Sequence, residues 1–160
     1  MLANTPKVST MNLFAPLSEI PPKTFETARL TLRAVELTDC ELMFKKYSGD
    51  PIITKYMAFP CASRPEDSLP FVKAVASNFA GEVSSHQQFA WLIFRKDSGE
   101  CIGLVGIGIN NPTTLGGGYG LSQDAWGKGF AAEAWQPIVE WAKSQPQVQR
   151  IEAKHHADNA

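Results

Sequence analysis

The chain has 160 residues, 44% of them hydrophobic, which is long enough for one globular domain with a buried core. Its 15 basic and 16 acidic side chains give a net charge of −1, which excludes general nucleic-acid binding because that function needs a basic face. It has no apolar run that could span a bilayer and no signal-peptide layout at its start, so we expect a cytoplasmic protein without a membrane partner.

The cysteines and histidines do not predict a metal site. Cys40, Cys61 and Cys101 are widely spaced and form no Cys-x-x-Cys motif, which is typical of reduced thiols and not of a zinc site or a disulfide framework. His155 and His156 are adjacent, and neighbours on a strand point to opposite faces, so the pair cannot chelate an ion. We therefore expect no metal.

The first part of the chain predicts a lead-in followed by a strand and short helices. Residues 1–25 are rich in proline and lack periodicity, so we expect an irregular N-terminal segment before a single domain at 26–160. Residues 29–33 alternate polar and apolar, which predicts a half-buried strand. Thr38 or Asp39 is then expected to cap a helix.

Two more helices are predicted before the middle of the chain. Asp50 and Pro51 are typical of the cap and first residue of a short helix that continues through Tyr56. Residues 63–67 are expected to open a longer helix, which Pro70 shortens or bends.

Beyond these helices the pattern changes to strands joined by short turns. Turn residues at 96–100 and 110–114 separate successive strands, which predicts an antiparallel meander. The expected strands of the meander are 89–94, 101–109 and 116–119. Residues 148–155 alternate again and predict a final strand.

The stretch from Gly118 to Trp141 organises the rest of the chain. A short apolar run precedes Gly127 and Gly129, and a helical pattern follows, so the prediction is strand, glycine turn and amphipathic helix. The apolar face is formed by Phe130, Ala131, Ala134, Ile138, Trp141 and Ala142. The first turn of a helix has unpaired N–H donors and a partial positive charge, so we expect an anion site there, with the charge of Lys128 at its rim.

The order of these motifs resembles the GNAT N-acetyltransferases, and within them the RimJ/RimL-type (ribosomal-protein-alanine N-acetyltransferase-like) branch. The resemblance covers residues 26–160 and rests on landmarks at 26–33, 48–51, 103–106, 118–119, 126–134 and 157–159. It implies an α+β, GNAT-like fold with a mixed, mostly antiparallel central sheet flanked by helices. It also implies an acetyl-CoA cleft beside the strand before the central helix.

The resemblance further implies an acyltransferase with acetyl-CoA as co-substrate. A primary amine, on a protein N-terminus or a small molecule, would attack the thioester directly in a ternary complex. The pyrophosphate would lie on N–H groups of the turn at 127–131, and the pantetheine arm beside the strand at 120–123. The implied cofactor-binding residues are Leu121, Ser122, Gln123, Gly127, Lys128, Gly129, Phe130, Ala131 and Asn159.

The sequence departs from the family pattern at several places. Asp124 stands where the superfamily signature begins with Gln or Arg, and Gly116 stands where many relatives carry a glutamate, so no catalytic residue is assigned. The helix and strand that follow Asn159 in similar proteins, with the serine that begins that helix, would lie beyond Ala160. We therefore expect that this C-terminally truncated domain either is a truncated product or completes its sheet by association, for example as a homo-oligomer.

Two other functions fit parts of the sequence. One is a GNAT-like protein that binds CoA without turnover, which the absent glutamate favours. The other is a dinucleotide-binding domain, because Gly127, Gly129 and Ala132 fit the Rossmann pattern, although the upstream hairpins argue against a parallel sheet. Nothing between residues 59 and 86 specifies the acceptor amine.

Two further side chains near the glycine turn receive an expected role. Core packing is expected for most of the tryptophans, but Trp126 abuts Gly127 and is the candidate to stack on an adenine or a substrate ring. Glu133 lies in the first turn of the predicted helix, where a structural role is expected.

Overall fold

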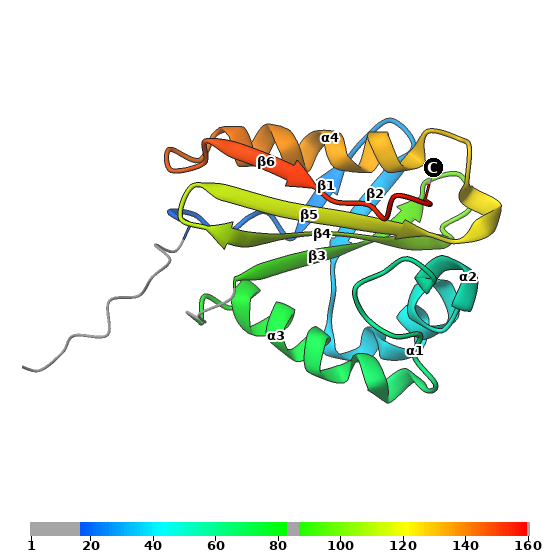
Figure 1. The fold of residues 1–160 in the computed structure, drawn as a ribbon. Helices are drawn as coiled ribbons and strands as arrows, with labels where there is room; N and C mark the ends of the chain where they lie inside the picture. The colour runs from blue at the N-terminus through cyan, green and yellow to red at the C-terminus, as the bar shows by residue number, and fades with distance from the viewer. Residues whose placement is uncertain (1–16, 83–86, 160) are drawn as a thin grey trace, which may run out of the picture.

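The structure, a computed structural model, describes residues 17–82 and 87–159. In this part of the chain a six-stranded sheet has the order β1-β2-β3-β4-β5-β6. The strands are β1 (Thr24–Glu26), β2 (Leu30–Ala34), β3 (Gln88–Arg95), β4 (Cys101–Asn111), β5 (Thr114–Leu121) and β6 (Arg150–Ala153). The helices are α1 (Cys40–Met43), α2 (Pro51–Thr54), α3 (Leu69–Phe79) and α4 (Phe130–Lys143). Helix α4 covers one face of the sheet, and α1, α2 and α3 cover the other (Figure 1).

The pairing of the strands confirms the expected α+β fold. Neighbouring strands from β1 to β5 are antiparallel, so β3, β4 and β5 form the predicted meander, and only the β5–β6 pair is parallel. Because a Rossmann domain needs a largely parallel sheet, the alternative of a dinucleotide-binding domain is wrong.

The core lies on both faces of the sheet, against α3 on one side and against the buried residues of α4 on the other. Trp91 and Phe89 of β3 are fully buried, and the ring of Phe79 meets both, with centroids 5.6 and 5.0 Å away. The indole N–H of Trp91 donates to the carbonyl of Pro22 at 2.9 Å, which ties the segment before β1 to the sheet. Strand β1 begins at Thr24, so the irregular lead-in ends before residue 25; the prediction for residues 1–16 lies outside the described residues.

The residues predicted to cap α1 and α2, Asp39 and Asp50, lie at the N-cap positions of these helices. A 3₁₀ turn at Leu37–Asp39 precedes α1, and Asp39 stands at the N-cap of α1, but its carboxylate makes no cap bond to that helix. It accepts instead from the backbone N–H of Glu36 at 2.7 Å. Asp50 does cap α2, accepting from the N–H of Ile52 at 2.7 Å. Helix α2 begins at Pro51 as predicted, but it ends at Thr54 and not at Tyr56, so it is shorter than expected.

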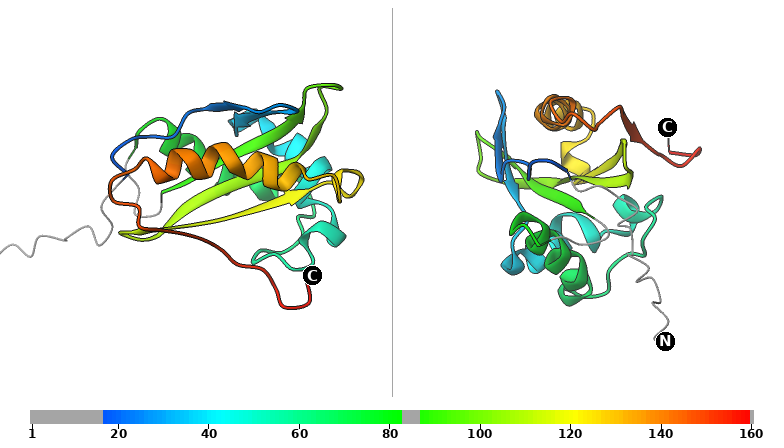
Figure 2. Two further views of the ribbon diagram at one scale, coloured as in Figure 1. Left: turned by 90° about the horizontal axis from the view of Figure 1, so that it is seen from above. Right: turned by 90° about the vertical axis from the view of Figure 1, so that its left-hand side faces the viewer.

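Helix α3 and strand β6 are both shorter than predicted. A 3₁₀ turn at Pro65–Ser68 precedes α3, and Pro70 lies in the first turn of the helix, where its missing N–H costs nothing. Strand β6 stops at Ala153, so the two histidines lie beyond it. The chain then diverges from β5 and runs towards the segment after α2, where the ring of His156 stacks on Tyr56 at 5.0 Å (Figure 2).

No helix within residues 17–82 or 87–159 combines the length and apolar character needed to cross a bilayer.

Candidate functional site

The junction of β5 and α4 forms the centre of the candidate site. After Leu121, a 3₁₀ turn at Gln123–Ala125 leads into Gly127 and Gly129, whose φ angles are +71° and +77°. This left-handed conformation is open to glycine at no steric cost. Gly129 is the N-cap of α4, and it has no side chain that could cap the first turn of that helix. The predicted order of strand, glycine turn and helix is therefore confirmed, and the turn presents backbone N–H groups at the positive end of the helix.

Strand β5 has an open edge next to this turn. Strand β4 pairs with β5 as far as Leu121, whereas the pairing with β6 ends at Gly117. The N–H of Ser122 donates to the carbonyl of Ile102 at 2.8 Å. Counting back from Ser122, the backbone N–H and C=O groups of every second residue therefore point towards β4, and those of the residues between them point to the opposite edge of β5. The backbone groups of Tyr119 and the N–H of Leu121 therefore point to an edge where no described strand pairs with them.

The side chain of Trp126 closes the end of this open edge. Its indole N–H donates to the carbonyl of Leu121 at 2.8 Å, and half of the residue is exposed. Trp91, in contrast, is buried, and Trp135 and Trp141 pack partly buried against the core. The expectation of core packing for most of the tryptophans is confirmed, while the stacking of Trp126 on a ligand stays a prediction.

The predicted site residues 121–131 lie together at this end of the sheet, where β5 leads through the glycine turn into α4. Leu121 is buried at the end of β5, and the Ser122 N–H is used by β4. Gln123 turns its side chain away and donates to the carboxylate of Asp50 at 2.9 Å, a bond that lowers the pKa of Asp50. Asn159 lies on the tail past β6, where its N–H donates to the carbonyl of His156.

Lys128 is held at the rim of the turn. Its ammonium donates to the carbonyl of Asp124 at 2.6 Å, on the exposed side of the turn. A hydrogen bond from Ser122 lowers the pKa of the Asp124 carboxyl, so the acid stays ionised beside the turn. The positive charge of Lys128 therefore lies at the rim of the turn, bonded to the Asp124 carbonyl and near the ionised Asp124 carboxylate.

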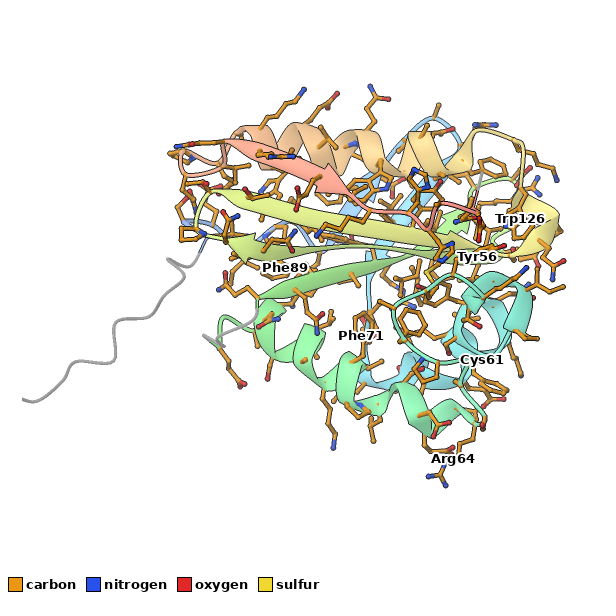
Figure 3. All side chains as sticks on the ribbon, in the orientation of Figure 1. Tyr56, Cys61, Arg64, Phe71, Phe89 and Trp126 are labelled. Atoms are coloured by element: carbon orange, nitrogen blue, oxygen red, sulfur yellow. The ribbon has the colours of Figure 1, made fainter. Side chains whose placement is uncertain are left out.

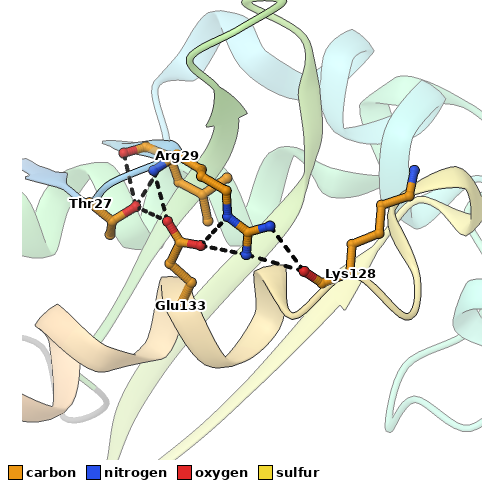
Figure 4. A network of polar contacts seen from close by, with 5 residues as sticks. Thr27, Arg29, Lys128 and Glu133 are labelled. Atoms are coloured by element: carbon orange, nitrogen blue, oxygen red, sulfur yellow. Dashed lines mark hydrogen bonds and ion pairs between the residues drawn. The ribbon is translucent and has the colours of Figure 1, made fainter.

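A polar network anchors the other side of the turn (Figure 4). The Glu133 carboxylate accepts from the hydroxyl of Thr27 at 2.6 Å, from the backbone N–H of Arg29 at 2.8 Å and from the Arg29 guanidinium at 2.6 Å. Burial alone would raise the pKa of the Glu133 carboxyl, but these hydrogen bonds outweigh it and lower the pKa. This network supports a structural role for Glu133. The sequence does not predict the contacts of Thr27 and Arg29 with Glu133, because nothing local links residues 27 and 29 to residue 133.

The contact of Tyr47 with β5, on the face of the sheet away from α4, was not predicted from the sequence. A Cβ on Gly120 would lie 1.9 Å from the Tyr47 ring, so this glycine gives the ring its place against the strand. The ring is buried, and burial raises the pKa of Tyr47 to about 12, which keeps the hydroxyl protonated near neutrality. No local pattern marks this contact, because residues 47 and 120 come together only through the fold.

In the described ranges, 17–82 and 87–159, no cluster of three or more His, Cys, Asp and Glu side chains is arranged to hold a metal ion.

Comparison with known proteins assigns this fold and site to a family. The sequence model of the acetyltransferase (GNAT) domain family matches residues 29–160. The chain therefore belongs to the GNAT acetyltransferases and is an N-acetyltransferase by class. It is 32% identical over 144 residues to the uncharacterized N-acetyltransferase p20 of Bacillus licheniformis, covering 86% of this chain and 75% of that protein.

Solved structures share the fold at low sequence identity. A GNAT-family acetyltransferase from Bacillus anthracis superposes with a TM-score of 0.68 at 20% identity, covering 85% of this chain and 75% of that one. RimL, a ribosomal L7/L12 alpha-N-protein acetyltransferase in complex with coenzyme A, gives a TM-score of 0.64 at 18% identity, with coverage of 88% and 77%. The expected GNAT fold, with RimL-type neighbours, is confirmed.

Proposed function

We propose that the protein transfers the acetyl group of acetyl-CoA to a primary amine by direct attack within a ternary complex. The observation that carries this proposal is the glycine-capped start of α4 beside the open edge of β5. The N–H groups of the helix start suit a pyrophosphate, and the N–H and C=O groups of Tyr119, which no described strand pairs, suit the amides of a pantetheine arm. The RimL neighbour, whose name records bound coenzyme A, supports the same cofactor here.

In this reaction the chain acts mainly by position. The amine nitrogen forms a bond to the acetyl carbon, the carbon–sulfur bond breaks, the amine loses one proton and the CoA sulfur gains one. Holding the two reactants together removes much of the entropic barrier, and N–H donors near the carbonyl stabilise the developing negative charge. No side chain is given the role of base or acid.

We place the acceptor on the α2 side of the open edge. Three large apolar side chains of α2, the segment after it and β5 are exposed to solvent: Ile52 by 55%, Phe59 by 40% and Tyr119 by 48%. We infer that the acceptor is a protein N-terminus or a small amine with some apolar character. The RimL name, which specifies an alpha-N-protein acetyltransferase, favours the protein N-terminus.

Calorimetry with CoA and acetyl-CoA, followed by a thiol-release assay across a panel of amines and N-terminal peptides, tests this function. Binding together with amine-dependent thiol release supports it. Binding without release from any amine would favour the alternative, a GNAT-like protein that binds CoA without turnover. No binding of either nucleotide would reject both.

The rate is expected to follow the ionisation of the acceptor amine. In the described part of the chain, the carboxyls with shifted pKa values, Asp124 and Glu133 among them, are all shifted downward, which makes them weak bases. For an amine of high pKa, kcat/KM should therefore rise about tenfold per pH unit through neutrality. A plateau near pH 7 in the measured profile would instead reveal a protein base.

We also propose that two copies of the chain associate along β6. This strand is the outermost one at its side of the described sheet, and an edge strand offers unpaired backbone groups to another chain. A shallow groove between α4 and β6, lined in part by Val139, Val148 and Ile151, adds apolar surface there. Size-exclusion chromatography with light scattering should show a dimer; a monomer at every concentration would contradict this.

A further inference from the structure

Arg29 contacts the glycine turn in a way that the transfer chemistry does not explain. Its guanidinium donates to the Glu133 carboxylate from one edge, with two contacts of 2.6 Å. From the other edge, both terminal nitrogens donate to the carbonyl of Lys128 at 3.1 Å. The ring of Phe130 lies 4.4 Å from the guanidinium carbon. One planar group therefore bridges helix α4 and the turn before it (Figure 4).

This bridge sets the direction of one N–H group in the turn. The carbonyl of Lys128 and the N–H of Gly129 belong to the same peptide plane and point in opposite directions when the bond is trans. Holding the carbonyl on Arg29 therefore turns the N–H of Gly129 away from Arg29. Because Gly129 has a left-handed conformation that glycine leaves easily, the plane needs such an anchor to keep one orientation.

We propose that Arg29 is a positioning residue for the cofactor: it holds the Lys128 carbonyl so that the Gly129 N–H faces the site of the pyrophosphate. The inference rests on the proposed function, because it assumes that an anion of CoA lies on this turn. Glu133 and Phe130 serve to hold the guanidinium in place. Arg29 acts through the backbone and not by touching the cofactor.

Replacing Arg29 by lysine tests the bridge while keeping the charge. An ammonium can pair with Glu133 or with the Lys128 carbonyl, but it lacks the planar fork that reaches both. In R29K, the Kd for CoA and the KM for acetyl-CoA should rise about tenfold, with kcat and the KM for the amine unchanged. Arg64→Lys is the matched control, because Arg64 also pairs with a carboxylate, that of Asp67 at 3.1 Å, on the face of the sheet away from α4 (Figure 3). Its constants should not change.

Two further measurements separate positioning from other roles. Amide hydrogen exchange at Gly129 in the CoA complex should be faster in R29K than in the wild type, and Glu133→Gln should raise the Kd for CoA in the same direction by a smaller factor. Dephospho-CoA should show the same fold loss in R29K as CoA. A loss confined to CoA would mean that Arg29 contacts the 3′-phosphate directly, and would overturn the proposal.

The outcomes also separate this inference from the proposed function. If the wild-type chain binds CoA and R29K binds it equally well, only the role of Arg29 is wrong. If the wild-type chain does not bind CoA, the proposed function and the role of Arg29 both fail. A fall in kcat and melting temperature at unchanged KM would show that Arg29 only stabilises the fold.

Discussion

Replacing Gly129 by glutamate is expected to abolish CoA binding while the domain stays folded. The new carboxylate would stand at the N-cap of α4, where it fills the space over the first N–H groups and repels a pyrophosphate. We expect a loss of more than about 100-fold in affinity, or roughly 3 kcal/mol. The fold should change little, because the left-handed strain of about 1–2 kcal/mol is offset in part by the favourable charge at the helix start.

Gly129→Ala is the control for this variant. A Cβ at this position would meet only the end of the Arg29 side chain, at 3.6 Å, so the methyl group fits. Alanine brings the same backbone strain without the charge, so it should bind CoA with a smaller loss. Calorimetry on both variants, with thermal unfolding, decides the matter. Wild-type affinity in Gly129→Glu would remove the pyrophosphate from this turn.

Replacing Gly103 by alanine is expected to destabilise the domain strongly. Gly103 lies in β4 opposite Leu121 with a φ of +149°, and a Cβ there would lie 2.1 Å from the carbonyl oxygen of Gly120. The clash is with backbone, so β4 and β5 must separate where they support the glycine turn. We expect a loss of about 3 kcal/mol or more in the free energy of unfolding. For a chain of this length the melting temperature should fall by roughly 6–12 °C.

Gly108→Ala provides the comparison on the same strand. A Cβ at Gly108 would make an ordinary contact, 3.5 Å from the carbonyl oxygen of Gln87. Its free energy of unfolding should stay within about 0.5 kcal/mol of the wild type. Denaturant titration of both variants measures the difference, and equal stability would show that β4 and β5 are not held as close as the structure has them.

Arg29 illustrates why part of the candidate site could not be predicted. In the sequence it is one polar position in an alternating strand pattern, and such a position is usually solvated. Its partners Lys128 and Glu133 are about one hundred positions away in the chain, at separations of 99 and 104 residues. Alternation gives the face on which a side chain lies, but it does not give the element packed on that face.

The sequence by itself determined the elements around the site, because their signals are local. Glycine at 127 and 129, an apolar period after them and alternating strands before them required only neighbouring residues, and the resemblance carried by those motifs indicated the GNAT fold. The tertiary structure decided what depends on contacts between distant segments. These include the end of the β6 pairing at Gly117, which opens the edge of β5, and the anchoring of the turn by Arg29. These features depend on where two strands separate and on which helix packs against which face of the sheet, and only the packing of the whole chain determines that.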